Sequence, residues 1–306
     1  MIMEKLLQSP LNYTGGKYRL LPQILPLFPD NINTFVDLFC GGANVGCNVV
    51  CNNVIFNDSN KHLINLLKTL RFIEKIDLFD SLSEIINKYN LSDSVKHDYS
   101  YYNCNSYSGL GQYNREGFNR LRYDFNNGEY NNCDYYIALY VLIIFSFNNQ
   151  IRFNNNGEFN LPVGKRDFNS RMQVKLSKFI DRLKSMPCTF ECKDFRNIEL
   201  NLNQNDFVYC DPPYLITCAT YNENGMWDSN DETELLEFLD RLNHNNIRFA
   251  LSNVLHSKGK SNDILINWIE NNAQYRCIHL NYNYSNSNYH TKDKKSGSDE
   301  VLIINY

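Results

Sequence analysis

The sequence lacks the usual marks of a secreted or membrane-spanning protein. Residues 1–5 have neither the basic nor the apolar region of a secretory signal, so we expect a reducing, cytoplasmic compartment in which the ten cysteines are thiols. The longest apolar stretch, residues 135–147, is shorter than the roughly 20 residues that span a bilayer and predicts a buried helix. With 306 residues, the chain can form one large domain or a domain carrying an insertion.

Spacing typical of a structural metal site is also missing. Cys47 and Cys51 are four apart, as are Cys188 and Cys192, but neither pair has the second pair or the histidine spacing of a zinc site. Core cysteines explain both pairs better. The six histidines are scattered along the chain, so the sequence predicts no metal.

The chain has no overall excess of positive charge, since 30 Lys and Arg stand against 34 Asp and Glu. The formal net charge of -4 argues weakly against a nucleic-acid partner, because phosphates are usually met by a basic face. Between residues 152 and 196, however, ten Lys or Arg stand against five acids. Two interpretations stay open: a basic face, and a solvated amphipathic helix over residues 171–184.

Strand-like runs alternate with helical patterns in both halves of the chain. The runs occupy residues 34–38, 54–58, 207–211 and 247–251. Leucines at helical spacing follow the second and third runs: Leu63, Leu66, Leu67, Leu70, Leu235, Leu236, Leu239 and Leu242. This alternation predicts a parallel α/β sheet. Two last runs, 275–282 and 300–306, predict an antiparallel hairpin at the sheet edge.

The alternation stops in the middle of the chain. Residues 78–184 are rich in Asn, Tyr and charged helical patterns, and we interpret them as an inserted, mainly helical domain. The sheet domain would then consist of residues 1–77 and 185–306.

Two turns after predicted strands carry residues suited to a ligand, which in α/β sheets binds at the carboxyl ends of the strands. Asp37 begins the first turn, where Gly41 and Gly42 let a ligand approach the backbone closely. Asp58 ends the second strand, a position that holds ribose hydroxyls in nucleotide-type folds. No long phosphate-cradling loop is present. Together the turns indicate an adenosine-containing cofactor rather than simple tight turns.

The segment 205–214 is predicted to be a strand that runs into Asp211, Pro212, Pro213 and Tyr214. The prolines fix the loop backbone and remove two amide donors. The Asp211 carboxylate and the Pro212 carbonyl can then accept both hydrogens of an adenine amino group and draw its nitrogen toward a nucleophilic geometry, while Tyr214 stacks on the ring. A simple strand-terminating turn would need neither the acid nor the aromatic residue.

Several motifs occur in the order found in one enzyme family. They occupy residues 12–17, 37–46, 57–58, 147–154, 157–166, 211–214, 251–254 and 297–303. Over nearly its whole length the chain resembles the Dam-type, alpha-class (D12) DNA adenine-N6 methyltransferases, including the bacteriophage-type Dam enzymes. The resemblance is least clear over residues 89–134, where the chain has extra residues. It implies a Rossmann-like S-adenosylmethionine-dependent methyltransferase sheet with an inserted helical and hairpin target-recognition domain.

The resemblance also implies roles for individual residues around the cofactor and the target base. Contacts with S-adenosylmethionine fall on Tyr13, Lys17, Asp37, Phe39, Gly41, Gly42, Asp58, Asp194, Phe195 and Asp211. Asp58 would hold the ribose, and Asp194 with Phe195 would flank the adenine of the cofactor. By the same resemblance, Asp211, Pro212, Pro213 and Tyr214 would form the catalytic loop that grips a flipped-out adenine. Methyl transfer from a sulfonium needs no metal and relies largely on alignment.

Residues 147–166 resemble the recognition hairpin of the family. DNA contacts are implied for Asn12, Phe147, Asn148, Asn149, Gln150, Arg152, Pro162, Lys165 and Arg166. Arginine is the natural bidentate partner of guanine O6 and N7, so Arg152 is expected to read a guanine, while Phe147 and Gln150 take the place of the wedge beside the extruded base. Gln150 is polar where an apolar wedge is usual, and Asn12 stands where some members have a basic residue. A short site such as GATC is the leading expectation.

These observations predict a site-specific adenine methyltransferase that acts on double-stranded DNA as a monomer or weak dimer. A restriction-modification system, a phage and a solitary methylation circuit are all compatible with the sequence. Two alternatives remain: an RNA base N-methyltransferase and a catalytically silent DNA-binding relative. The Arg152 hairpin favours duplex DNA over RNA, and an intact Asp211 argues against the silent relative.

Overall fold

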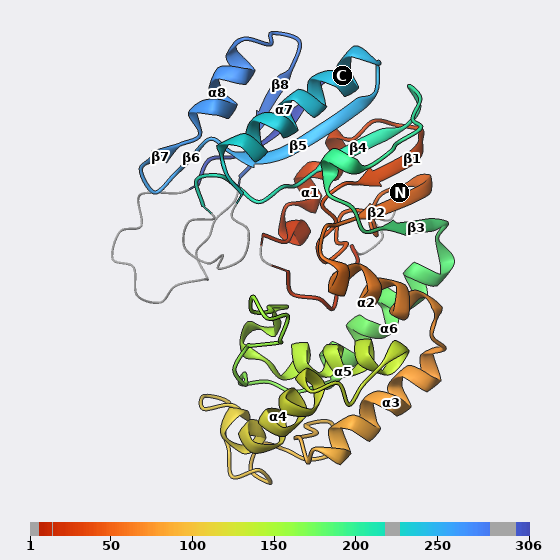
Figure 1. The fold of residues 1–306 in the computed structure, drawn as a ribbon, viewed down its shortest axis with the longest axis vertical. Helices are drawn as coiled ribbons and strands as arrows, with labels where there is room; N and C mark the ends of the chain where they lie inside the picture. The colour runs from red at the N-terminus through yellow and green to blue at the C-terminus, as the bar shows by residue number, and fades with distance from the viewer. Residues whose placement is uncertain (1–5, 14, 218–226, 282–297) are drawn as a thin grey trace. The chain divides into compact units, whose positions relative to one another are not determined.

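The computed structural model describes residues 6–13, 15–217, 227–281 and 298–306 (Figure 1). The chain divides into two compact units. The first, here called the sheet unit, comprises residues 17–59 and 187–306. The second, here called the helical unit, comprises residues 1–16 and 60–186. Each unit is described by itself.

A seven-stranded sheet forms the centre of the sheet unit, with strand order β3-β2-β1-β4-β5-β9-β8. The strands are β1 Ile32–Asp37, β2 Cys51–Asn57, β3 Cys188–Glu191, β4 Phe207–Cys210, β5 Arg248–Val254, β8 Arg276–His279 and β9 Glu300–Ile304. The pairings from β3 to β5 are parallel, and β9 is antiparallel to both β5 and β8. The predicted parallel α/β sheet and its terminal antiparallel hairpin are therefore confirmed, while the hairpin loop at 282–297 lies outside the described residues.

Alternating side chains on these strands build two apolar faces, because successive residues of a strand point to opposite sides. Val36, Val208 and Phe249 belong to a core cluster that also contains Leu235 and Leu265. Those leucines come from helices α7 Ser229–His244 and α8 Asp263–Glu270, which pack against each other near β5 (Figure 1). Helices α7 and α8 therefore cover this face of the sheet.

The opposite face is covered by the segment before β1, which contains η1 Lys17–Arg19, α1 Leu21–Ile24 and η2 Leu25–Leu27. Phe28 ends this segment, and its ring lies 4.8 Å from that of Phe207 and 5.5 Å from that of Tyr209. Asp37 points to the same face as Phe35, two residues earlier. The unit is completed by η4 Phe195–Asn197 and the short strands β6 His256–Ser257 and β7 Lys260–Ser261.

Five α-helices account for most of the helical unit's described structure: α2 Lys61–Phe72, α3 Lys75–Lys88, α4 Gly111–Asn126, α5 Asn132–Phe145 and α6 Ser170–Ser185. From Ile137 to Phe145, helix α5 is apolar and buried on all sides, and α2, α3 and α4 pack around it. The buried helix expected from residues 135–147 is confirmed. The turn η3 Phe147–Asn149 follows it directly.

Within the described ranges, no helix is long and apolar enough to cross a membrane.

Candidate active site and recognition hairpin

Three carboxylates lie at the carboxyl ends of neighbouring parallel strands. Asp37 is the last residue of β1, Asp58 follows β2, and Asp211 follows β4. The strand order reverses beside β1, since the chain continues to β2 on one side and β4 lies on the other. Such a switch point is where open α/β sheets bind ligands. The fold thus brings together the acids that the sequence singled out.

Asp37 is buried and accepts a hydrogen bond from the Gly46 amide at 2.9 Å. The turn between them passes closely over β2, because a Cβ at position 46 would lie 2.4 Å from the Phe56 ring. Burial raises the pKa of Asp37 to about 7, and the charges of Asp211 and Asp58 add to the effect. The site therefore holds a carboxyl group that titrates near neutral pH.

Asp58 is also buried, and its Oδ2 accepts from the Gly41 amide at 3.1 Å. Gly41 has a φ of 46°, in the left-handed region that glycine adopts without strain. The neighbouring Asn57 donates to the carbonyls of Leu38 and Lys193, both at 3.0 Å. These bonds fix the first and second turns relative to each other.

The catalytic loop predicted from the sequence is anchored through Asp211. Its Oδ1 forms an ion pair with the buried Lys17 ammonium at 2.8 Å and accepts from the Tyr214 hydroxyl at 3.1 Å. Tyr214 also donates to Glu300 at 3.3 Å, and the Lys17 Nζ lies 4.8 Å from the centre of its ring. Burial raises the pKa of Asp211, and Lys17 lowers it. Lys17, which the sequence resemblance predicted to contact the cofactor, therefore also contacts the loop directly.

An aromatic cluster lies next to these turns. Phe39 contacts Phe195 with ring centres 5.6 Å apart, and Trp227 lies 5.7 Å from both. The Asp194 side chain caps η4 and binds Arg196, which also bonds to Asp231 and Glu234. Phe195 and Phe39 could thus offer a ring face to a cofactor base, while Asp194 is already held by Arg196.

Asn12, predicted to contact DNA, and Tyr13, predicted to contact the cofactor, belong to the helical unit. The other predicted cofactor residues belong to the sheet unit. Asn12 donates from its side chain to the Asn148 carbonyl at 2.6 Å. Two residues predicted to contact DNA are therefore adjacent. The Tyr13 carbonyl accepts from the Gly16 amide at 3.1 Å.

The predicted recognition hairpin is a loop with two antiparallel bridges, Ser146 to Val163 and Phe153 to Phe159. At the base of the hairpin, a Cβ on Gly164 would lie 2.3 Å from the Ser146 carbonyl oxygen. Only glycine therefore lets the two sides of the hairpin approach each other this closely. Side chains predicted to meet DNA are exposed along the loop: Phe147, Asn148, Arg152, Pro162, Lys165 and Arg166. Asn149 and Gln150 are half-buried.

The charge surplus at 152–196 is divided between the two units. Lys193 and Arg196 belong to the sheet unit, and Arg196 is bound by three carboxylates. In α6, Lys184 pairs with Glu74, and the apolar stripe of the helix is buried. The amphipathic-helix interpretation is therefore confirmed for α6. The exposed Lys165 and Arg166 are cations of the hairpin itself.

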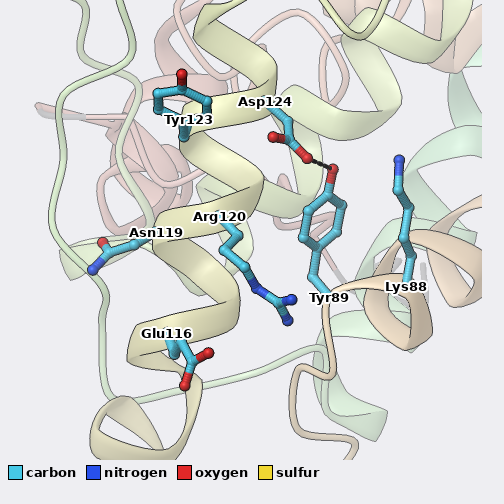
Figure 2. Close-up of a pocket in the computed structure, with 7 residues that line it drawn as sticks. All are labelled: Lys88, Tyr89, Glu116, Asn119, Arg120, Tyr123 and Asp124. Carbon is cyan, nitrogen blue, oxygen red and sulfur yellow. Dashed lines mark hydrogen bonds between the residues drawn. The ribbon is translucent and has the colours of Figure 1, made fainter.

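An open pocket of about 460 Å³ lies between the end of α3 and helix α4, in the helical unit (Figure 2). It is lined by Lys88, Tyr89, Glu116, Asn119, Arg120, Tyr123 and Asp124. The Tyr89 hydroxyl donates to Asp124 at 2.6 Å, as the dashed line in Figure 2 marks. Cations and acids alternate on its walls, and none of the residues predicted from the sequence lines it. The candidate catalytic residues lie at the strand ends instead.

Nine cysteines lie within the described ranges, all as free thiols, and Cys218 lies outside them. The prediction of core cysteines is wrong for Cys192, which is exposed beyond the end of edge strand β3. Cys47 is buried as expected. Among the described residues, no cluster of three His, Cys, Asp or Glu side chains could hold a metal ion.

Two residues of the candidate site, Glu300 and Trp227, were not predicted from the sequence. Glu300 is buried at the start of β9 and holds the Tyr214 hydroxyl. Trp227 joins the aromatic cluster, and its indole donates to the buried Glu232 at 2.6 Å. Glu300 lies within the motif at 297–303, but a single acid there does not reveal which residue it bonds to.

Asp37→Asn is expected to become more stable relative to the wild type as the pH rises from about 4 to 7. Burial raises the pKa of Asp37 from 3.8 to about 7. Over this window the unfolded chain loses a proton that the folded chain retains, so wild-type stability declines until Asp37 ionises in the folded state. The difference should reach a few kcal/mol by urea unfolding without ligand. A stability difference between Asp37→Asn and the wild type that stays constant with pH would contradict the raised pKa of Asp37.

The mostly parallel sheet, with its acidic carboxyl edge beside an Asp-Pro-Pro-Tyr loop, has the fold of a Rossmann-like methyltransferase. The family described as D12 class N6 adenine-specific DNA methyltransferase matches residues 13–295, and the chain belongs to this family.

Three relatives illustrate the relationship. The modification methylase StsI of Streptococcus sanguinis is 42% identical over 99% of this chain and 43% of its own length. The type II methyltransferase M.FokI of Planomicrobium okeanokoites is 41% identical over 98% of this chain and 43% of its own length. The DNA adenine methylase of Haemophilus influenzae is 29% identical over 67% of this chain and 63% of its own length. The chain spans less than half the length of the first two.

Proposed function

We propose that this chain transfers a methyl group from S-adenosylmethionine to the N6 amine of a flipped-out adenine in double-stranded DNA. The observation that carries the proposal is the loop Asp211, Pro212, Pro213 and Tyr214, held by Lys17 at the carboxyl end of β4. Membership of the D12 class supports the same reaction.

The site suits a cationic adenosine derivative. Asp37, Asp58 and Asp211 are close enough for their charges to raise the pKa of Asp37, so a positively charged ligand would relieve their repulsion. Asp58 would accept from the ribose hydroxyls, and the rings of Phe39 and Phe195 would pack on the adenine. When bound, S-adenosylmethionine supplies an activated methyl group on a sulfonium.

The loop would prepare the target amine. Both Lys17 and Tyr214 bond to Oδ1 of Asp211, which leaves Oδ2 as the acceptor that we assign to one amine hydrogen. The Pro212 carbonyl would accept the other. The stacking role of Tyr214 stays a prediction, because its side chain is only 9% exposed and its hydroxyl is tied to Glu300.

Lys17→Met is expected to move the acidic limb of the pH profile of kcat to higher pH. Lys17 lowers the pKa of the buried Asp211, so its removal raises that pKa and leaves less of the reactive carboxylate at a given pH. Lys17→Arg, which keeps the charge, is the control. The measurement is kcat against pH at saturating cofactor, and an unmoved limb in Lys17→Met would contradict the role of Lys17.

Transfer of a labelled methyl group separates the proposed function from its alternatives. We expect label on adenine in duplex DNA and none on RNA. Label on RNA alone would favour the RNA base N-methyltransferase. DNA binding without any transfer would favour the silent relative.

The remaining assignments are also proposals. Residues 78–184 would form the target-recognition domain and residues 1–77 with 185–306 the catalytic domain. We propose a short site containing a guanine, with GATC the leading candidate, and a cytoplasmic enzyme that is a monomer or weak dimer. The names of the modification methylase StsI and the type II methyltransferase M.FokI support a restriction-modification setting.

A further inference from the structure

We propose that Asn160 is a positioning residue that aims the Arg152 guanidinium at a guanine. The proposal rests on the proposed function, since it takes Arg152 as the residue that reads the base. Asn160 was not among the residues singled out from the sequence. It lies on the returning side of the recognition hairpin, opposite Arg152.

Two hydrogen bonds join the Arg152 guanidinium to Asn160. The Arg152 Nε donates to the Asn160 Oδ1 at 2.7 Å, and Nη2 donates to the Asn160 carbonyl at 3.3 Å. A guanidinium is a planar fork, so occupying the edge formed by Nε and Nη2 directs the edge formed by Nη1 and Nη2 outward. That outward edge still carries the two parallel donors that guanine O6 and N7 require.

The backbone around Asn160 is itself held in place by helix α4. Asn126 donates to the Phe159 carbonyl at 3.1 Å and accepts from the Phe159 amide at 2.9 Å. Arg122 donates to the Leu161 carbonyl at 2.8 Å. The residues on both sides of Asn160 are therefore fixed, and the Asn160 amide donates to the Arg152 carbonyl at 3.2 Å.

This arrangement matters because arginine is a long, flexible side chain. A free arginine on an exposed loop would lose rotamer freedom when it bound a base, and that loss would weaken the contact. Asn160 restricts Arg152 before DNA arrives. It would therefore raise discrimination at one guanine, while contributing little to the attraction for phosphates.

The test uses the whole chain and a duplex that contains its mapped methylation site. Each guanine is replaced in turn by 7-deazaguanine, which lacks the N7 acceptor, and kcat/KM and competitive binding are compared with the parent duplex. In the wild type we expect one guanine at which the replacement costs roughly 5- to 150-fold. Arg152→Ala should abolish the effect at that guanine, and Asn160→Ala should reduce it several-fold.

Three further variants separate positioning from a structural role. Asn160→Asp keeps the acceptor and should retain discrimination, and the double variant with Arg152→Ala should discriminate no worse than Arg152→Ala alone. Asn155→Ala, on the exposed turn of the same hairpin, should behave like the wild type. In contrast, Lys165→Ala should weaken binding to all sequences alike.

The outcomes distinguish this inference from the proposed function. A chain that methylates no DNA would overturn the proposed function. Discrimination unchanged in Arg152→Ala would overturn the base-reading role of Arg152, on which this inference rests, and would leave the proposed methyl transfer standing. If Arg152→Ala loses discrimination while Asn160→Ala keeps it, the positioning role of Asn160 alone is wrong. An additional loss caused by Asn160→Ala in the Arg152→Ala background would also contradict it.

Discussion

Asp211→Ala is expected to lower kcat by about two orders of magnitude or more while DNA affinity stays within a few-fold of the wild type. The carboxylate is the acceptor that turns the target amine toward the methyl group, and it is held in place by Lys17 and Tyr214. Removing it takes away an interaction that strengthens in the transition state. Single-turnover methylation and DNA binding measured on the same preparation test this expectation.

Thermal melting of Asp211→Ala provides the control for folding, because the substitution leaves the buried Lys17 without its carboxylate. Asp211→Asn adds a second test, since it keeps an oxygen acceptor without the charge and should be impaired as well. Activity of the alanine variant within a few-fold of the wild type would show that the loop does not perform the chemistry.

Asp58→Ala is expected to weaken S-adenosylmethionine binding by roughly 10- to 150-fold, the equivalent of about 1.5–3 kcal/mol for charge-assisted bonds to the ribose. Asp58 is buried at the end of β2, where it also fixes Gly41 through the amide. Calorimetry gives the cofactor affinity, and DNA affinity should change far less. Asp80→Ala, on the exposed side of α3, is the matched control. Unchanged cofactor affinity in Asp58→Ala would move the pocket elsewhere.

The parts of the fold that sequence reasoning found have strong local patterns. Strands β1, β2, β4 and β5 contain short apolar runs bounded by polar residues, and β4 is followed by Asp211 and two prolines. Strand β3 was missed because it lies at the sheet edge, where it is only partly buried and shows no apolar run. Its pairing with β2 depends on partners distant in sequence, which no local pattern reports.

The features of the candidate site also divide into those with a local sequence pattern and those that depend on tertiary structure. Asp37, Asp58 and Asp211 could be predicted because each ends or directly follows a recognisable strand. The Lys17 ion pair with Asp211, the Glu300 anchor of Tyr214 and the Asn160 bond to Arg152 could not, since each joins residues through tertiary structure. These contacts set the geometry of the site, and the residue types along the sequence do not reveal them.

Direct mapping of methylated adenines is the measurement that tests most closely whether this chain methylates adenine in DNA. The chain and its Asp211→Ala variant would be expressed in cells without other adenine methylation, and long-read sequencing would locate N6-methyladenine in the DNA. We predict methylation at one short motif with a guanine near the target, present with the wild type and absent with the variant. DNA without N6-methyladenine in cells that contain the folded wild-type chain would contradict the account.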